Sequence, residues 1–383
     1  MIVYFGNTLN KHQSNVADVL YELTNGDYVY VETVPPRVDN THGGKLKVER
    51  PYVLAAYQDK LLAKEAHRLA READVVLFGA ESFCFEMERM SLKHPGLAFE
   101  VSERWLKRGW LNIFSPRLLR NIWCYHTRGW KNKPLYKLCS SAYGAGDQYR
   151  LHTFKHRCFK WGYFTEVDEN EVEAPLGVST SKRATIMWCA RFLKLKHPEL
   201  VIALARKLKD SGYDVRIDMY GDGEEKDRIA LMRDGLHVED IVSLKGSVSN
   251  GEVLRAMREH DIFLFTSDRR EGWGAVLNEA MSNGCAIVAS DAIGSVPFLI
   301  TNNENGLIFR SNDIASLYEK TVYLLEDSYK RQQMAHQAYK TMRELWSPQK
   351  AAENLLKLVN DLNNERQSSI LEGPCSKAVP FKG

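Results

Sequence analysis

The chain has 383 residues, of which 44% are hydrophobic and 26% are charged, and its formal net charge is +3. This length exceeds what one hydrophobic core supports, so we expect a globular protein of two domains. The N-terminus has neither the basic lead nor the apolar core of a secretory signal, and no apolar run approaches the roughly 18 residues that span a bilayer. The seven cysteines are scattered without paired spacing, which favours reduced thiols in a cytoplasm over disulfides or a zinc site.

Short apolar runs alternate with amphipathic stretches along the first half of the chain, which is typical of a doubly wound parallel sheet. We expect strands at 1–7, 28–34, 74–80, 97–103 and 137–142, and helices at 14–26 and 59–73.

The second half repeats this alternation more regularly. Its helix at 198–212 has Pro198 at the first position and Gly212 at the end, as helices prefer. The expected elements are strands 185–190, 215–221, 241–246, 261–267, 285–291 and 306–309, and helices 198–212, 225–235, 251–260, 274–283, 314–327 and 328–345.

The two halves are expected to join in residues 166–183, which are first acidic and then rich in Pro, Gly and Ser. A last helix at 348–365 follows the second half, and the tail beyond it is polar, without periodicity and therefore expected to be disordered. The predicted organisation is a first domain at 1–168, a second domain at 169–347, a helix at 348–365 and a tail at 366–383.

The segment EGWGAVLNEAM, bracketed by Glu271 and Glu279, lies between two predicted buried strands. It is therefore expected to form a strand-to-helix turn followed by its helix. Gly272 and Gly274 flank Trp273 where the backbone must approach something closely. This position, at the carboxyl end of a strand and beside a helix N-terminus, is where open α/β sheets bind phosphorylated ligands.

Four segments of the second half occur in an order that identifies a family. They are ARFLKLKH, IDMYGDGEE, EGWGAVLNEAM and NGLIF, and the first half adds the less specific FGNTLNKHQ, FEVSERWLKRG, LYKLCSSAYGAGD and FKWGYF. From residue 1 to about 362 the chain resembles GT-B glycosyltransferases of family 4 (glycosyl transferases group 1), in particular a subgroup of bacterial surface-polysaccharide clusters. The resemblance implies an α/β fold of two Rossmann-like, doubly wound domains facing across a cleft. It also implies that the domain at 1–168 binds the acceptor, that the domain at 169–347 binds the nucleotide sugar, and that the helix at 348–365 crosses back to the first domain.

The chemistry of sugar transfer requires positive charge, because a leaving nucleoside diphosphate gathers negative charge on its phosphate oxygens. Arg191 and Lys196, five positions apart after a strand, are expected to hold those oxygens. The backbone N–H groups of Ala275 and Val276, at a helix start, would stabilise the same charge. Relatives usually carry glycine after the lysine, where this chain has His197.

By resemblance, Glu271 would hydrogen-bond the hydroxyls of the donor sugar, and Glu279 would accept both ribose hydroxyls. Gly221 and Gly223 would let the backbone pass close to the nucleotide. Gly6 and Asn7 replace a double glycine of many relatives, and Asn7 would keep the turn because Asn tolerates left-handed backbone angles. The expected donor-binding residues, besides Glu279, are Gly272, Trp273, Gly274, Ala275, Val276, Gly221, Ser247, Val248, Gly6 and Asn7.

The acceptor side is less clearly marked, because the sequence reads SERW where many relatives carry a histidine. Glu103 would orient or deprotonate the acceptor hydroxyl, or else form an ion pair with Arg104 or a neighbouring cation. His12, which follows the first strand, and His126 are the other candidates.

Residues 90–161 form a basic aromatic segment. Fourteen Lys or Arg but only three acidic residues occur between residues 90 and 160. Either this is a solvated basic face whose tryptophans are core residues, or it is a surface for an anionic partner such as acidic lipid headgroups, a lipid-linked diphosphate or an acidic glycan. No nucleic-acid motif accompanies the charge, so nucleic acid is not expected. The tryptophans concerned are Trp105, Trp110, Trp123, Trp130 and Trp161.

The predicted function is a retaining, metal-independent hexosyltransferase that moves a sugar to a glycan or lipid-linked acceptor for cell-surface polysaccharide. It would act in the cytoplasm or as a peripheral protein on the inner face of the membrane. No cofactor is expected besides the nucleotide-sugar co-substrate, with a UDP-sugar ahead of a GDP-sugar because UDP is commoner among relatives. The alternative is a non-catalytic nucleotide-sugar-binding or scaffold subunit of a polysaccharide assembly complex. A nicotinamide oxidoreductase is disfavoured because no G-x-G-x-x-G follows the first strand.

Overall fold

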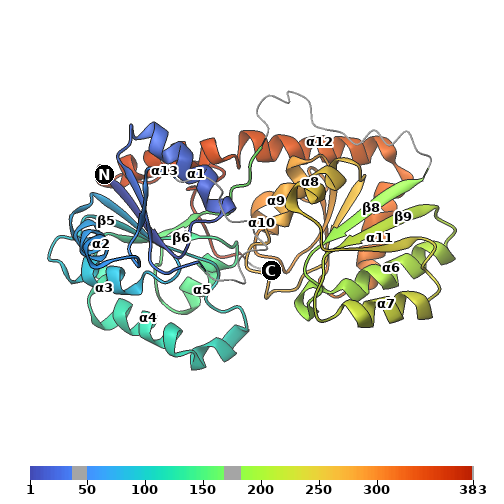
Figure 1. Cartoon of the computed structure of the whole chain (residues 1–383), viewed down its shortest axis with the longest axis horizontal. Coiled ribbons are helices and arrows are strands. Elements are labelled where there is room, and N and C mark those ends of the chain that lie inside the picture. The colour runs from blue at the N-terminus through green and yellow to red at the C-terminus, as the bar shows by residue number, and fades with distance from the viewer. Residues whose placement is uncertain (37–49, 168–182, 382–383) are drawn as a thin grey trace. The chain divides into compact units, whose positions relative to one another are not determined.

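The computed structural model describes residues 1–36, 50–167 and 183–381, which form two compact units (Figure 1). Unit 1 comprises Met1–Glu166 together with Trp346–Gly383, and unit 2 comprises Val167–Leu345. Most of the expected linker at 166–183, including the predicted boundary at 168/169, lies outside the described residues.

Unit 1 is built on a seven-stranded parallel sheet of order β3-β2-β1-β4-β5-β6-β7. Its central strands are apolar and buried, as expected when helices cover both faces of a parallel sheet. The five strands predicted from the sequence are present, and β3 and β7 add a short strand at each edge. The strands are β1 Ile2–Gly6, β2 Tyr28–Glu32, β3 Val53–Ala55, β4 Val75–Phe78, β5 Leu97–Ser102, β6 Leu135–Cys139 and β7 Cys158–Lys160.

Helices cover both faces of this sheet, with α1 and α13 on one face and α2, α3 and α4 on the other (Figure 1). Asn10 caps α1 and Asp59 caps α2, each through its side-chain oxygen. The helices and 3₁₀ turns of this part are α1 Lys11–Leu23, α2 Lys60–Glu72, α3 Phe83–Ser91, η2 Gly109–Phe114, α4 Pro116–Thr127, η3 Trp130–Asn132 and α5 Gly144–Arg150.

Unit 2 is built on a six-stranded parallel sheet of order β10-β9-β8-β11-β12-β13. All six strands agree with the sequence prediction. They are β8 Ala184–Cys189, β9 Val215–Tyr220, β10 Val242–Gly246, β11 Ile262–Phe265, β12 Ala286–Ser290 and β13 Leu307–Phe309.

The helices of unit 2 also form two layers, with α6, α7 and α11 on one face of the sheet and α8, α9 and α12 on the other (Figure 1). In α6, Val201, Leu204, Ala205 and Leu208 are buried, and Leu200 is partly covered. The helices are α6 Pro198–Asp210, α7 Lys226–Gly235, α8 Asn250–Arg258, α9 Val276–Ser282, α10 Val296–Leu299, α11 Ile314–Glu326 and α12 Ser328–Glu344, with the 3₁₀ turn η4 Lys194–Lys196 before α6.

The last helix, α13 Pro348–Asn363, belongs to unit 1 and packs against α1. The tail after it departs from the sequence prediction, because residues 366–381 are ordered on unit 1. Its backbone pairs with β7, through Cys375 N–H to the Lys160 carbonyl at 2.7 Å and Lys160 N–H to the Ser376 carbonyl at 2.8 Å. The polar composition and the lack of periodicity predicted disorder, but these backbone hydrogen bonds do not depend on side-chain type.

Candidate active site

The best-defined cluster of predicted site residues lies at the carboxyl edge of the unit 2 sheet. From β8 the strands proceed to β9 and β10 on one side, and β11, β12 and β13 lie on the other. The winding therefore reverses between β8 and β11, and the loops that leave these two strands lie side by side. Such a switch point is where doubly wound sheets bind ligands.

Lys196 and Glu271 meet at this switch point. The Lys196 ammonium, in the loop after β8, forms an ion pair with Oε2 of Glu271, in the loop after β11. The same carboxylate oxygen accepts a hydrogen bond from Ser267 Oγ at 3.1 Å. Both charged side chains are about 15% exposed, so the pair is mostly desolvated yet reachable by a ligand.

The two loops are held together by backbone and side-chain hydrogen bonds. Thr266 Oγ1 donates to the Lys196 carbonyl at 2.6 Å and itself accepts from Trp188 Nε1 at 2.9 Å. Asp268 N–H donates to the Leu195 carbonyl at 2.9 Å. The position of Lys196 is therefore fixed by buried partners and not only by its ion pair.

His197, which stands where relatives have glycine, adopts a left-handed backbone with φ 49° and ψ 52°. Its ring lies between two carboxylates, with Nδ1 2.7 Å from Glu199 Oε1 and Nε2 3.3 Å from Asp268 Oδ2. The hydrogen bond with Glu199 is the main cause that raises the pKa of His197. His197 thus keeps the backbone geometry that glycine permits. Its two contacts with Glu199 and Asp268 offset the strain of a left-handed backbone at a residue with a side chain.

The other cation, Arg191, begins the same loop and is exposed. Its carbonyl accepts the N–H of Leu193 at 2.8 Å, which starts the turn toward η4. Arg191 and Lys196 thus flank one tight turn. Lys194, inside that turn, is also exposed.

Three glycines near these loops are required by close backbone or ring approaches. A Cβ at Gly221 would lie 2.0 Å from the Ala190 carbonyl oxygen, and one at Gly223 would lie 2.7 Å from the Phe192 carbonyl oxygen. A Cβ at Gly274 would lie 2.2 Å from the Phe265 ring. All three have positive φ. The close approach predicted at Gly274 is therefore to the chain's own strand β11.

Trp273 is not placed as a donor-binding side chain. Its side chain is 0% exposed, and its Nε1 donates to Asn278 Oδ1 at 2.9 Å. Its carbonyl accepts from Ser295 Oγ at 2.6 Å. Trp273 is thus a core residue that fixes the turn before α9. The sequence does not indicate this burial, because the residue lies between two glycines in a predicted turn.

The neighbours of Trp273 are Gly272, which is buried, and Ala275 and Val276, which begin α9 and are half-buried. Backbone N–H groups in the first turn of a helix have no intrahelical acceptor. Those of Ala275 and Val276 remain predicted donors to a bound anion.

Glu279 lies one turn into α9 and is half-buried. Its Oε1 accepts a hydrogen bond from Asn250 Nδ2, the first residue of α8, at 3.2 Å. Cys189, at the end of β8, is close to both Glu279 and Lys196, and burial followed by the charge of Glu279 raises the pKa of its thiol to about 12. The structure therefore places Lys196, Glu271 and Glu279 around the end of β8. Asn250 and Cys189 were not predicted, since neither belongs to a motif.

The remaining donor candidates lie at other strand ends. Ser247, after β10, is exposed and Val248 is half-buried. Gly6 ends β1 in unit 1, where an added Cβ would lie 2.4 Å from the Tyr30 hydroxyl. Asn7 is not among the described residues with positive φ, so the expected left-handed turn at Asn7 is wrong. Gly6 is required by the packing of Tyr30.

On unit 1, two of the acceptor-side candidates converge on a residue that was not predicted. Tyr163, beyond β7, donates from its hydroxyl to Glu103 Oε1 at 2.8 Å. Its ring stacks on His12, with centroids 5.9 Å apart and planes 8° apart. Glu103 also forms an ion pair with Lys107, and not with Arg104, which pairs with Asp147. All these residues follow the carboxyl ends of β1, β5 and β7, the edge at which ligands bind.

Arg104 and His126 are placed elsewhere. Arg104 forms a two-point ion pair with the buried Asp147, at 3.0 and 3.3 Å, so its role is structural. His126 lies in the last turn of α4, with Nε2 3.3 Å from the Leu151 carbonyl. Of the four acceptor-side candidates, the structure brings together His12 and Glu103.

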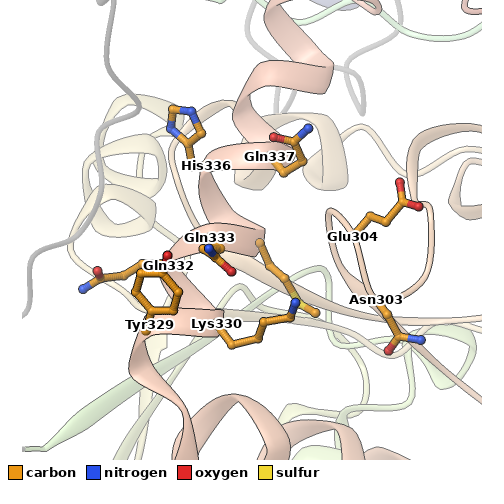
Figure 2. Close-up of a pocket in the computed structure, with 9 residues that line it drawn as sticks. Asn303, Glu304, Tyr329, Lys330, Gln332, Gln333, His336 and Gln337 are labelled. Atoms are coloured by element: carbon orange, nitrogen blue, oxygen red, sulfur yellow. The ribbon is translucent and has the colours of Figure 1, made fainter.

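Other features of the described residues add no catalytic site. A surface hollow of about 520 Å³ lies between α12 and the loop containing Asn303 and Glu304, and no predicted site residue lines it (Figure 2). Within residues 1–36, 50–167 and 183–381, no group of three or more His, Cys, Asp or Glu is arranged to hold a metal ion. In the same ranges no helix is long and apolar enough to cross a membrane.

The two sheets define the class of fold, which is the GT-B architecture of glycosyltransferases. The solved structure of HepE from Anabaena in complex with UDP and glucose matches with a TM-score of 0.66 at 14% identity, over 94% of this chain and 99% of that one. This confirms the fold predicted from the sequence.

Residues 174–341 match the sequence model of the family glycosyl transferases group 1. Poly(ribitol-phosphate) alpha-N-acetylglucosaminyltransferase of Staphylococcus aureus (strain COL) is 26% identical over 171 residues, 45% of this chain and 34% of that protein. N-acetylgalactosamine-N,N'-diacetylbacillosaminyl-diphospho-undecaprenol 4-alpha-N-acetylgalactosaminyltransferase of Campylobacter jejuni is 28% identical over 172 residues, 45% of each chain. The matches thus span about a third and just under half of these relatives.

Proposed function

We propose that this protein is a retaining glycosyltransferase that takes its sugar from a UDP-sugar and acts in the synthesis of a cell-surface polysaccharide. Unit 2 binds the donor, and unit 1 binds the acceptor. The observation that carries this proposal is the Lys196–Glu271 pair at the switch point of unit 2, with Glu279 beside it. The family match of residues 174–341 and the UDP-bound HepE structure support it.

In the proposed donor complex, Lys196 exchanges its present partner for the diphosphate. The diphosphate oxygens take the ammonium, and the freed Glu271 accepts hydrogen bonds from the sugar hydroxyls. Arg191 adds a second cation from the start of the same turn, and Glu279 accepts from the ribose. The mostly desolvated Lys196 and the exposed Arg191 stabilise the charge that grows on the leaving phosphate, which is why we propose a reaction that needs no metal ion.

Retention follows if the acceptor hydroxyl attacks from the face that the phosphate leaves. The anomeric carbon loses its bond to the phosphate oxygen and gains one to the acceptor oxygen. The acceptor proton passes to the departing phosphate on that face. Glu271 supports the positive charge on the sugar while the first bond loosens. No covalent enzyme intermediate is required by this scheme.

For the acceptor, we propose that Glu103 and Tyr163 bind hydroxyl groups and that His12 fixes the Tyr163 ring. Burial is the main cause that lowers the pKa of His12, so its ring is neutral at pH 7 and stacks without a charge penalty. The names of the two relatives describe a polyol-phosphate polymer and an undecaprenol-linked saccharide as substrates. An anionic or lipid-linked glycan therefore forms the proposed acceptor class. The seven unpaired cysteines support a reducing, cytoplasmic location.

The test is release of nucleoside diphosphate from a panel of UDP-, GDP- and dTDP-sugars, with and without glycan acceptors. We expect turnover of a UDP-sugar, and loss of that turnover in Glu271→Ala with the fold intact by circular dichroism. Binding of UDP-sugars without any turnover would instead indicate a non-catalytic nucleotide-sugar-binding subunit. Turnover by Glu271→Ala at the parent rate would reject the site.

A further inference from the structure

The part of unit 1 formed by η2 and α4 exposes an unusual number of large apolar side chains. Of the sixteen large hydrophobic residues that are exposed in the described part of the chain, six fall within residues 110–123. We call residues 108–128 the η2–α4 surface. Its exposed apolar residues are Trp110 (60%), Leu111 (70%), Ile113 (38%), Phe114 (75%), Leu119 (53%) and Trp123 (49%).

The arrangement of these side chains is not that of a helix covering a core. In α4, Leu118, Cys124 and Tyr125 point inward and are buried, whereas Leu119 and Trp123, one turn apart, share the outer side. The 3₁₀ turn η2 has no buried residue and packs against α4. The two elements therefore present one apolar surface on the outside of unit 1. Patches of this kind mark interaction sites.

The charges on this surface specify the partner. The sequence has no acidic residue between Glu103 and Asp147. Arg108, Arg117, Arg120 and Arg128 are all exposed among the apolar residues, and the Arg128 guanidinium lies 4.7 Å from the centre of the Trp123 ring. A partner must accept apolar side chains and carry negative charge over the same area.

We propose that the η2–α4 surface docks unit 1 on a bilayer that contains anionic phospholipid. Tryptophan and leucine would enter the boundary between headgroups and acyl chains while the arginines bind lipid phosphates. Duplex nucleic acid offers the charge but no apolar layer for Leu111, Phe114 and Leu119. Of the five tryptophans noted in the sequence, Trp130 and Trp161 are buried and Trp105 is half-buried, so only Trp110 and Trp123 belong to this surface. The inference does not depend on the proposed transfer reaction.

The experiment is co-sedimentation of the full chain with vesicles of phosphatidylcholine alone or with phosphatidylglycerol, at 0.05 and 0.5 M salt. We expect binding to anionic vesicles that weakens at high salt. The variant Arg108→Ser/Arg117→Ser should bind about thirtyfold more weakly, since each basic residue near an anionic surface contributes about 1 kcal/mol. The variant Leu111→Ser/Phe114→Ser/Leu119→Ser should lose about a hundredfold or more.

Matched controls are Leu61→Ser on α2 and Leu231→Ser on α7, whose side chains are 76% and 75% exposed outside the surface. Both should bind vesicles like the parent, and all variants should keep the parent's melting temperature. The proposal is overturned if neither vesicle type is bound, if salt has no effect, or if the triple variant binds unchanged. It is also overturned if the triple variant abolishes self-association or DNA binding while vesicle binding is absent.

Discussion

The carboxyl edges of the two parallel sheets carry different residues for their two proposed ligands. In unit 2, charged side chains meet at a switch point, and glycines such as Gly221 leave no room for a Cβ. In unit 1, the corresponding edge carries a tyrosine, a histidine and a carboxylate, joined by one hydrogen bond and one ring stack. A diphosphate nucleotide imposes a fixed charge and a fixed backbone path, whereas the sugar end of an acceptor is held by hydroxyl and ring contacts. Substitutions in unit 2 should therefore have larger effects than those in unit 1.

The largest effect is expected for Lys196→Ala. It removes a positioned cation from the departing phosphate and should lower kcat about a thousandfold, as loss of a preorganised charge contact does. The control is Lys194→Ala, two residues away in the same turn but exposed, which should keep kcat within about threefold. Steady-state kinetics with the preferred donor measures kcat for both variants. Equal losses of kcat would show that only the net charge of the loop matters.

Gly221→Ala tests the fixed backbone path. The new Cβ would lie 2.0 Å from the Ala190 carbonyl oxygen at φ 127°, so we expect unfolding of unit 2 to become easier by about 3 kcal/mol. Gly251→Ala in α8 meets nothing within 4 Å and should be neutral or slightly stabilising. Urea unfolding measures the free energy of unfolding of both variants. If Gly221→Ala is as stable as the parent, this account of the turn is wrong.

Glu279→Gln keeps the shape and the contact with Asn250 but removes the charge. If Glu279 accepts from the ribose, UDP should bind about thirtyfold more weakly, since hydrogen bonds to charged groups contribute about 1.5–3 kcal/mol. Calorimetric titration with UDP gives the affinity. Glu224→Gln, exposed in the loop after β9, serves as the control and should bind UDP like the parent.

Tyr163→Phe tests the acceptor edge of unit 1. Loss of the hydroxyl that donates to Glu103 should lower kcat/KM for the acceptor about tenfold while the KM of the donor stays unchanged. Tyr149→Phe, on a residue that is 56% exposed, should leave both constants unchanged. A change in the donor KM alone would assign Tyr163 to the donor instead.

The smallest effect concerns pH. The pKa of His197 is raised above 6.5 by its hydrogen bond with Glu199, so its charged form stabilises the fold fully below pH 6.5 and this contribution is lost as pH rises through the raised pKa. Relative to His197→Gly, the parent should therefore lose about 1 kcal/mol of unfolding free energy between pH 6 and 9. His237→Gly, at a position that is also left-handed (φ 51°) but has an exposed side chain, controls for the effect of placing glycine at such a position.

The regular parts of both sheets could be predicted from the sequence, because buried parallel strands are short apolar runs and their helices have apolar stripes. The predictions failed where neighbours decide the structure. The strand β3 is three half-buried residues, and α3, α4 and α5 lie in the basic aromatic segment or close to it, where no clean period marks them. The tail was missed because its order rests on backbone pairing with β7.

The site shows the same division. Lys196, Glu271 and Glu279 stand in motifs and are brought together, whereas Trp273, from the same motif, packs in the core. Arg104 was a candidate because of its place beside Glu103, and only the distant Asp147 reveals it as structural. Tyr163 forms its hydrogen bond with Glu103, 60 positions away in the sequence, and Asn250 forms its hydrogen bond with Glu279, 29 positions away. Such pairings depend on the fold and have no local signature.

The pairing of the C-terminal segment with β7 also covers one edge of the unit 1 sheet. β7 is the last strand of its sheet, and an open strand edge can recruit strands from other molecules. Residues 375–378 occupy that edge in antiparallel fashion at Phe159, and Lys377 places a charge there. Shortening the chain after Asn363, or fusing a tag that displaces this segment, would uncover the edge and open a route to aggregation.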